Sequence, residues 1–341
     1  MNALVTGATG FVGSAVVRAL LARGAAVRTL ARAGSNRLNL AGLDGVTTIE
    51  GDLTQPESLA AAVRGCDTVF HVAAFYSTRE EDARLMYQIN VGGTKNLLQA
   101  ARAAGVTRFV HCSTIGTVGR PRGGGLPTED DEFLLWETSS HYARSKYLAE
   151  ELAVGACSAG LPVVVVNPCA PVGVGDIKPS SSGQRVLDYL EGRMPKFLDG
   201  GINFISVEDV AAGHILAAER GRIGQRYILG HRDGNLPLDG FLALMERVTS
   251  LPRPGLQEPR ASWRLLRRLR QPPAGAAPLP SMAPAALTCN PAKAIRELGL
   301  PQTPLDQALC EAVIWFGRHG YIRRARRVPK LESALAVSLV D

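Results

Sequence analysis

Tyr142 and Lys146 lie four residues apart in the segment His141-Tyr142-Ala143-Arg144-Ser145-Lys146. In a helix this spacing places the two side chains on the same face, one turn apart. A lysine ammonium beside a phenol favours the phenolate, and it lowers the phenol pKa from about 10 towards neutrality. Because a tyrosine of this kind can act as a general acid or base, the pair predicts proton transfer to or from a bound substrate.

A second chemical signal is the glycine-rich stretch Gly7-Ala8-Thr9-Gly10-Phe11-Val12-Gly13, which follows a predicted strand and opens a predicted helix. The first glycine permits the tight turn, Gly10 lets phosphates approach the backbone, and Gly13 lets the helix pack closely on the strand. A helix N-terminus in this position favours a pyrophosphate. The stretch therefore predicts a dinucleotide cofactor.

The choice between NAD and NADP depends on the residues after the second predicted strand, Leu30-Ala31-Arg32-Ala33-Gly34-Ser35-Asn36-Arg37. An acidic residue there would bond the ribose 2′-hydroxyl of NAD, and the stretch contains none. Arg32 and Arg37 can make charge-assisted bonds to a 2′-phosphate, although solvated loop arginines are the alternative. The sequence therefore favours NADP(H), with NAD(H) as the second candidate cofactor.

Apolar runs of strand length alternate with segments of helical spacing over residues 1–170. Helices are predicted at 14–23 and 90–104, and Gly24 and Gly105 stand where their C-terminal stops belong. Such alternation indicates an α/β fold with a doubly wound parallel sheet, the Rossmann architecture. The predicted strands cover residues 3–5, 26–30, 47–50, 68–72, 108–112 and 162–166.

The remainder of the chain predicts a smaller, irregular α/β lobe at residues 171–321 that binds the substrate, with strands able to interleave with the first domain. It contains a predicted helix at 207–220 and a predicted strand at 226–230. Residues 322–341 are predicted to be a flexible tail. Between two proline-rich stretches, Ser262-Trp263-Arg264-Leu265-Leu266-Arg267-Arg268-Leu269-Arg270 has the composition of an interfacial helix, and a lid helix with a solvated basic face is the alternative.

Composition limits the function classes. The 341 residues are 46% hydrophobic and 20% charged, with a net charge of +7, which is ordinary for a globular protein. The basic excess lies in the C-terminal third, but the sequence contains no signature of a nucleic-acid-binding motif, so no nucleic acid is expected. The six scattered cysteines predict small buried hydrophobes in a reducing compartment, with no metal site. We expect a cytoplasmic protein, with peripheral association at a membrane surface as an extension of that expectation.

The chemical motifs occur together with Cys112-Ser113-Thr114, Asp52-Leu53 and Val72-Ala73-Ala74, each placed after a predicted strand. In this combination the sequence resembles the extended short-chain dehydrogenase/reductase superfamily, also called the NAD-dependent epimerase/dehydratase superfamily, over residues 1–320. The resemblance implies that Tyr142 is the general acid/base, that Lys146 also holds the nicotinamide ribose, and that Thr114 orients the substrate oxygen. Further positions implied to contact the cofactor are Asp52 and Leu53 at the adenine, Ala73 and Ala74 along the ribose-phosphate path, and Asn167 and Pro168 at the nicotinamide.

Two stretches carry narrower resemblances that bear on the substrate. Asn167-Pro168-Cys169-Ala170-Pro171-Val172-Gly173 is similar to the hopanoid-associated sugar epimerase family, and Ala212-Gly213-His214-Ile215-Leu216-Ala217-Ala218-Glu219 is similar to the sterol C4-decarboxylating 3β-hydroxysteroid dehydrogenases. Related sugar-nucleotide epimerases carry an arginine for the diphosphate where this chain has Ile202. A diphosphate without its counter-charge is held poorly.

These observations predict an NADP(H)-dependent oxidoreductase acting on a secondary alcohol or ketone of a polycyclic isoprenoid lipid, a sterol or hopanoid, with 3β-hydroxysterol oxidation and C4 decarboxylation as one form. A sugar epimerase of hopanoid side-chain biosynthesis is the alternative enzyme, and a non-catalytic NAD(P)-sensing regulator is the alternative of another class. The superfamily resemblance also implies a homodimer through the helices that contain Asn90 and Tyr142. The histidines in apolar segments, His71, His111 and His214, are expected to be structural, with their ring nitrogens hydrogen-bonded.

Overall fold

A seven-stranded parallel sheet forms the centre of the larger lobe, with strand order β3-β2-β1-β4-β5-β6-β9. The computed structural model describes residues 1–121, 123–134, 136, 139–255 and 286–322. The predicted doubly wound parallel sheet is confirmed. Its strands are β1 (Asn2–Thr6), β2 (Ala26–Ala31), β3 (Val46–Glu50), β4 (Thr68–His71), β5 (Arg108–Cys112), β6 (Val163–Pro168) and β9 (Arg226–Leu229).

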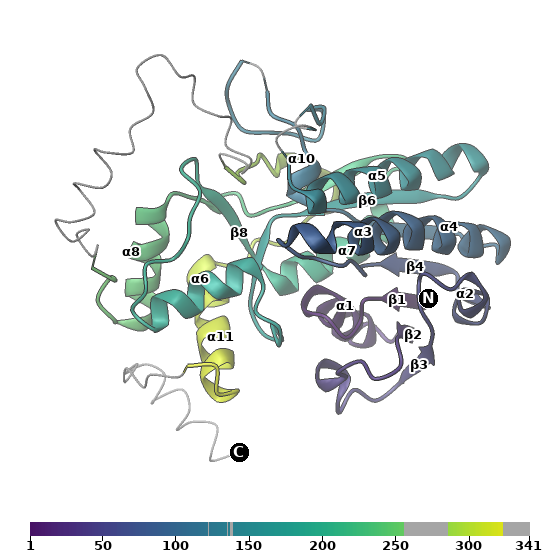
Figure 1. Cartoon of the computed structure of the whole chain (residues 1–341), viewed down its shortest axis with the longest axis horizontal. Coiled ribbons are helices and arrows are strands. Elements are labelled where there is room, and N and C mark those ends of the chain that lie inside the picture. Colours follow the sequence, from purple (N-terminus) through teal and green to yellow (C-terminus); the bar gives the residue numbers. More distant parts are fainter. Residues whose placement is uncertain (122, 135, 137–138, 256–285, 323–341) are drawn as a thin grey trace.

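Both faces of this sheet are covered by helices, as expected for buried parallel strands. Along β1, Ala3 and Val5 join the core beneath α1 and α7, whereas Leu4 joins the core beneath α2, α4 and α5. Figure 1 shows α1 and α7 on one side of the sheet and α4 and α5 on the other. The covering helices are α1 (Phe11–Leu21), α2 (Pro56–Val63), α3 (Ala83–Tyr87), α4 (Thr94–Ala103), α5 (His141–Gly155), α7 (Val207–Arg220) and α10 (Ala292–Leu298).

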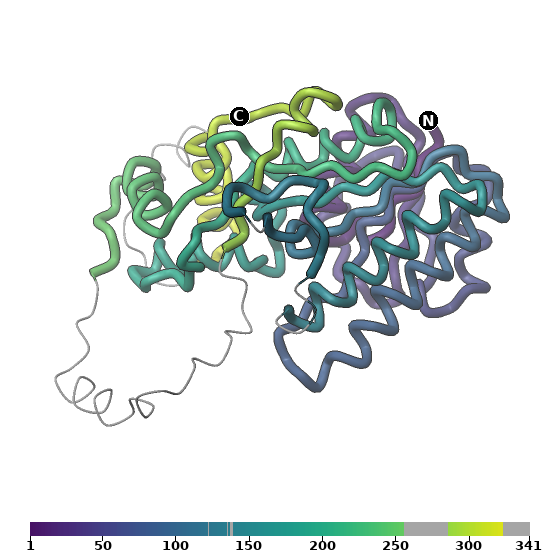
Figure 2. The backbone as a smooth tube through the Cα atoms, turned by 90° about the horizontal axis from the view of Figure 1, so that it is seen from above, coloured from purple at the N-terminus to yellow at the C-terminus, as the bar shows by residue number. Residues whose placement is uncertain are grey.

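A smaller lobe is built around a three-stranded sheet of order β10-β8-β7. Its core joins Phe204 of the central strand to Phe241 and Phe316 of two helices. Figure 2 shows these green and yellow segments gathered beside the larger lobe. The elements are β7 (Ala170–Val172), β8 (Ile202–Ser206), β10 (Asn235–Leu236), α6 (Ser181–Leu190), α8 (Leu238–Thr249) and α11 (Leu305–Arg318).

The chain passes between the lobes more than once. After β7 and α6 it forms β8, returns to the larger lobe as α7 and β9, and then forms β10 and α8. β9 pairs in parallel with β6, from Val165 opposite Arg226 to Pro168 opposite Leu229. The larger lobe is therefore completed by chain that follows residue 170.

Two helix starts differ from the prediction. α1 begins at Phe11 rather than at residue 14, because the glycine turn ends at Gly10, the N-cap. The helix predicted at 90–104 instead contains a π-helical segment, Gln88–Gly93, followed by α4. A π turn carries an extra residue and often marks a functional site. Gly24 and Gly105 stand just beyond their helices with φ of 71° and 70°, as predicted.

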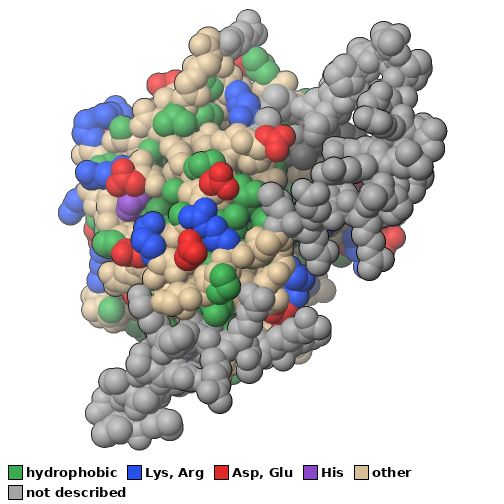
Figure 3. All heavy atoms as spheres, turned by 90° about the vertical axis from the view of Figure 1, so that its left-hand side faces the viewer, with side chains coloured by type: hydrophobic (Ala, Val, Ile, Leu, Met, Phe, Trp, Pro, Cys, Tyr) green, Lys and Arg blue, Asp and Glu red, His purple; other side chains and the backbone are tan. Residues whose placement is uncertain are grey.

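Most of the basic excess lies beyond the residues that the structure describes. The predicted interfacial helix at 262–270 and almost all of the predicted tail fall within 256–285 and 323–341, so both stay predictions. Figure 3 shows basic and acidic side chains interspersed over the described part of the smaller lobe's face. None of the helices in the described ranges is long and apolar enough to cross a membrane.

Candidate active site

The carboxyl ends of β1 and β4 meet at the point where the strand order reverses, which is where open α/β sheets bind ligands. Gly7 follows β1 with φ of +72°, and a Cβ there would lie 2.7 Å from the Ala73 backbone after β4. A Cβ on Gly13 would lie 2.1 Å from the carbonyl oxygen of Gly7. Strand, turn and helix are thus in close contact, and only glycine fits at either position.

The first turn of α1 remains accessible to a ligand. Gly10 is exposed and extended, and no side chain caps the helix or places an acidic group in its first turn. Thr9, Phe11 and Val12 are only partly buried around it. Free N–H groups at such a helix end suit a phosphate, so this cradle fits the pyrophosphate of a dinucleotide.

Other predicted cofactor positions lie around the same edge of the sheet. Asp52 accepts hydrogen bonds from the backbone N–H and hydroxyl of Thr54, and Leu53 packs against the backbone of Gly93. The Ala73 N–H donates to Thr6 Oγ1 at 3.3 Å, and Ala74, which follows it, is exposed. The ribose-phosphate position Ala73 therefore flanks the glycine turn, and the adenine position Leu53 adjoins the π-helical segment at Gly93.

Arg32 and Arg37 lie in the loop that follows β2, and both are exposed. Neither side chain has a hydrogen bond or ion pair to another described residue, so both are available to an anion. β2 ends at Ala31 without a carboxylate. The loop therefore offers two guanidinium groups where a 2′-phosphate would lie.

Tyr142 and Lys146 occupy successive turns of α5, whose N-cap Ser140 accepts from the Ala143 N–H. The structure brings both next to Cys112 at the end of β5. Lys146 is 2% exposed, and its Nζ donates to the Cys112 carbonyl oxygen at 2.6 Å. A cation so deeply buried needs such a partner; burial lowers its pKa.

The expectation that Lys146 lowers the phenol pKa is not met in this arrangement. Burial raises the pKa of Tyr142, and the neighbouring Cys112 and Tyr76 raise it further. The physical reason is that the Lys146 ammonium donates to the Cys112 carbonyl, while desolvation of the phenol disfavours its anion. Tyr142 is therefore held as the neutral acid.

Thr114 closes β5 beside the start of α5. Its Oγ1 accepts from the Gly116 N–H at 3.2 Å, and a Cβ on Gly116 would lie within 4 Å of both the Thr114 side chain and Ala143 Cβ. Thr114 is only partly buried. The structure thus brings Thr114 next to the turn of α5 that carries Tyr142.

Ser113 points elsewhere, into a buried polar network. Its hydroxyl donates to Glu150 Oε2, which also accepts from Thr117 and from the amide of Asn167. Arg226 of β9 approaches Glu150 Oε1 at 3.2 Å. The network joins β5, α5, β6 and β9, and it fixes the backbone beneath Thr114.

Asn167 belongs to this network rather than to an open surface. Its Nδ2 also donates to the Thr114 carbonyl oxygen, and its Oδ1 is buried without a partner among the described residues. Pro168 follows as the last residue of β6 and pairs with Leu229. Both predicted nicotinamide positions therefore adjoin the Thr114 loop.

Asn90 was not singled out by the sequence analysis, although it links the site's walls. It lies in the π-helical segment, 2% exposed. Its amide accepts from the Phe75 N–H, and donates to the Phe75 carbonyl and to Ser145 Oγ. It thereby ties the loop after β4 to α5. The sequence feature that could have identified Asn90 is a polar residue on an otherwise apolar helix face.

The buried histidines differ in the hydrogen bonds that their ring nitrogens make. His71 contacts Thr6 and Thr94 through its two ring nitrogens, as expected. His111 contradicts the expectation, because neither ring nitrogen has a partner in the described part of the chain. Burial, with Lys146 nearby, lowers its pKa well below the ordinary value, so it packs as a neutral ring. His214 bonds through Nδ1 alone.

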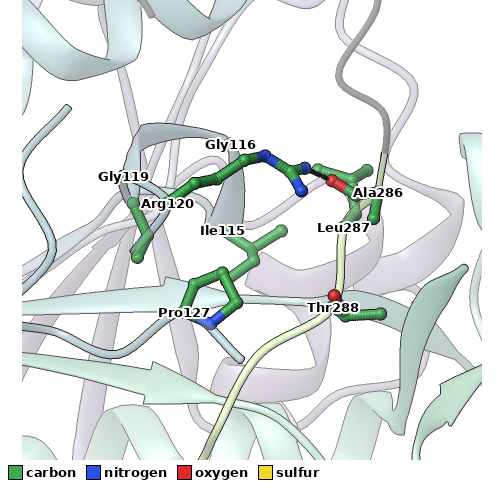
Figure 4. Close-up of a pocket in the computed structure, with 9 residues that line it drawn as sticks. Ile115, Gly116, Gly119, Arg120, Pro127, Ala286, Leu287 and Thr288 are labelled. Atoms are coloured by element: carbon green, nitrogen blue, oxygen red, sulfur yellow. Dashed lines mark hydrogen bonds between the residues drawn. The ribbon is translucent and has the colours of Figure 1, made fainter. Parts of the chain in front are cut away.

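A pocket lies beside Thr114, between the lobes. Figure 4 shows Ile115, Gly116 and Pro127 facing Leu287 across it, with the Arg120 guanidinium bonded to the Ala286 carbonyl. Leu287 bridges to Ile202 of β8. The lining is mostly apolar, and Arg120 is occupied by a backbone acceptor, so the pocket suits an apolar group.

The comparisons with known proteins agree with this geometry. The sequence model of the NAD dependent epimerase/dehydratase family matches residues 3–230. The chain belongs to this family. It is an NAD-dependent oxidoreductase of the extended short-chain type.

Three relatives span nearly the whole chain. It is 39% identical to a Synechocystis protein with the provisional name dihydroflavonol 4-reductase (94% of this chain, 95% of that one). Sterol demethylase protein B of Methylococcus capsulatus is 36% identical over 94% of this chain and 100% of its own. The crystal structure of gox2253 superposes with a TM-score of 0.83 at 37% identity, covering 94% of this chain and 99% of that one.

Replacing Gly13 with Ala should disrupt the cofactor cradle, because the new Cβ would lie 2.1 Å from the Gly7 carbonyl oxygen. We expect a lower melting temperature and at least tenfold weaker NAD or NADP binding by titration calorimetry, equivalent to about 1.4 kcal/mol. Gly155→Ala at the end of α5 is the matched control, since nothing lies within 4 Å of its Cβ. Unchanged affinity in Gly13→Ala would contradict the assigned cradle.

Proposed function

We propose that this chain is a dehydrogenase or reductase of a secondary alcohol or ketone on a polycyclic isoprenoid lipid, a sterol or a hopanoid. The observation that carries this proposal is the mostly apolar lining of the pocket beside Thr114. Ile202, which stands where related epimerases carry a diphosphate-binding arginine, is 1% exposed in the core of the smaller lobe. The likeness to sterol demethylase protein B supports the same substrate class.

In the proposed mechanism, Tyr142 moves the proton of the substrate hydroxyl while Thr114 Oγ1 orients the same oxygen. The bound nicotinamide supplies the acceptor or donor of a hydride at the carbinol carbon. Lys146 would hold the nicotinamide ribose, and Gly7, Gly10 and Gly13 would receive the pyrophosphate. Because its pKa is raised, the partly buried Tyr142 phenol is protonated and carries the proton that a reduction needs, whereas oxidation requires its pKa to fall.

One form of the reaction would combine oxidation with loss of carbon dioxide. If the lipid carries a carboxylate on the carbon next to the alcohol, oxidation gives a β-keto acid. The bond to the carboxylate carbon then breaks, carbon dioxide leaves, and the electron pair passes into the ketone as an enolate that is protonated afterwards. This form accounts for the likeness to sterol C4-decarboxylating enzymes.

Tyr142→Phe removes the hydroxyl and retains the ring that packs edge-on against Tyr76 at 4.9 Å. We expect turnover to fall by 10²- to 10⁴-fold, the usual contribution of a general acid or base, with cofactor affinity nearly unchanged. Lys146→Met should lose both turnover and cofactor affinity. Activity of Tyr142→Phe within threefold of wild type would exclude proton transfer by Tyr142. It would favour another group as the general acid or base.

We propose NADP(H) as the preferred cofactor, because Arg32 and Arg37 offer exposed cations after β2. Changing both to Ala should weaken NADP binding by about 10- to 100-fold, at roughly 1.5–3 kcal/mol for a charged hydrogen bond, and should leave NAD binding within about twofold. The test is to measure the dissociation constants of NADP and NAD for wild type and for the double variant. Equal losses would show that the loop does not read the 2′ position.

The substrate class is tested by incubating the purified protein with sterols, hopanoids and UDP-sugars while following cofactor absorbance. A polycyclic lipid alcohol or acid should support turnover, because the pocket beside Thr114 favours an apolar group and a diphosphate would lack its cation at Ile202. Epimerisation of a UDP-sugar with no turnover of any sterol or hopanoid would instead establish the sugar-epimerase alternative. Cofactor binding without any turnover would favour the sensing regulator.

A further inference from the structure

Arg185 is a half-buried cation on α6 with unused hydrogen-bonding capacity. Its side chain folds back towards the first turn of α6, where Nη1 donates to the Ser181 carbonyl oxygen. The guanidinium carbon lies 5.8 Å from the ring centroid of Phe197. Its Nε is buried and has no partner in the described part of the chain. A buried donor of this kind favours a ligand that supplies an acceptor.

A short series of contacts connects Arg185 with the reacting centre. Ser181, whose carbonyl it binds, contacts the Tyr76 hydroxyl through Oγ at 3.2 Å. The Tyr76 ring meets Tyr142 edge-on at 4.9 Å, and 51% of Tyr76 is exposed. The loop after β4 and the start of α6 thus form one open wall, with Tyr142 at one end and Arg185 at the other.

The charge of Arg185 is not neutralised by a direct ion pair. Across the described ranges, no carboxylate lies within 4.0 Å of its guanidinium. The nearest acid on α6 is Asp188, whose Oδ1 accepts from Gln184 and from Arg193. Arg193 also pairs with Glu191. Arg193, just beyond the end of α6, is therefore paired with carboxylates, whereas Arg185 has no direct ion pair and one unpartnered donor among the described residues.

We propose that Arg185 binds a carboxylate on the substrate, close to the alcohol that Tyr142 serves. The inference rests on the proposed function and deepens it, since it defines the lipid as an acid. A planar guanidinium makes charge-assisted bonds to a carboxylate, and the adjoining Phe197 offers an apolar face to the ring system. A single cation without a direct ion pair matches a monoanion better than a diphosphate, for which Ile202 provides no second charge.

The test compares a 3β-hydroxysterol 4-carboxylic acid with its methyl ester, measured by equilibrium binding and by cofactor turnover. Arg185→Met removes the charge and retains an unbranched side chain over Phe197. It should weaken binding of the acid by about 10- to 100-fold, as expected for a lost charged hydrogen bond, and change that of the ester by less than twofold. Arg185→Lys should recover part of the affinity for the acid. Arg193→Met, a partnered cation beyond the end of the same helix, is the control and should bind both lipids like wild type.

The outcomes separate this inference from the proposed function. Preference for the acid that disappears in Arg185→Met supports the inference even if neither lipid is turned over, in which case only the proposed oxidation fails. Equal loss of acid and ester would show that Arg185 is structural, and would overturn the inference. It would also be overturned if wild type binds acid and ester equally, or if UDP-glucose, tested in parallel, is the ligand whose binding depends on Arg185. Melting temperatures establish that each variant is folded.

Discussion

A single buried ammonium determines how this site can work. Lys146 is almost fully enclosed by α5 and the ends of β4 and β5, and its Nζ donates to the Cys112 carbonyl oxygen at 2.6 Å. Burial lowers the pKa values of the His71 and His111 imidazoles, and the nearby Lys146 charge lowers them further. Neutral rings can share the interior with the ammonium, whereas a second cation there would be costly. Lys146 therefore depends on the position of the β5 end, which supplies its hydrogen-bond acceptor, and on neutral histidines in β4 and β5.

The surrounding structure keeps those strand ends in place. On one side the Glu150–Arg226 pair and its hydrogen-bonded neighbours join β5, β6 and β9. On the other, Asn90 joins the loop after β4 to α5. α6 of the smaller lobe meets the same loop where Ser181 Oγ contacts the Tyr76 hydroxyl. The strands thus position the glycine turn and Tyr142, and α6 of the smaller lobe lies beside them.

Much of the fold was predictable because it depends on local patterns. The glycine turn at Gly7–Gly13 and the alternation of strands and helices are properties of neighbouring residues, and the structure reproduces them. Lys146 and Tyr142 were identified by their spacing, but spacing could not show that the ammonium binds the Cys112 carbonyl. Contacts between distant segments were likewise invisible in the sequence. Cys169 and Cys289, for example, lie 120 residues apart and bring their sulfur atoms within 3.3 Å, and β9 joins a sheet whose other strands end at residue 168.

We infer that the raised pKa of the partly buried Tyr142 phenol falls when the oxidised cofactor binds. Tyrosine labelled with ¹³C at Cζ allows its titration to be followed by NMR, with Tyr142→Phe identifying the signal. In the free protein the midpoint should lie above the ordinary value of about 10. With NAD⁺ or NADP⁺ bound it should fall by about 1–3 pH units, because a positive charge close to the phenol favours the phenolate. An identical titration midpoint of Tyr142 with and without oxidised cofactor would contradict this inference.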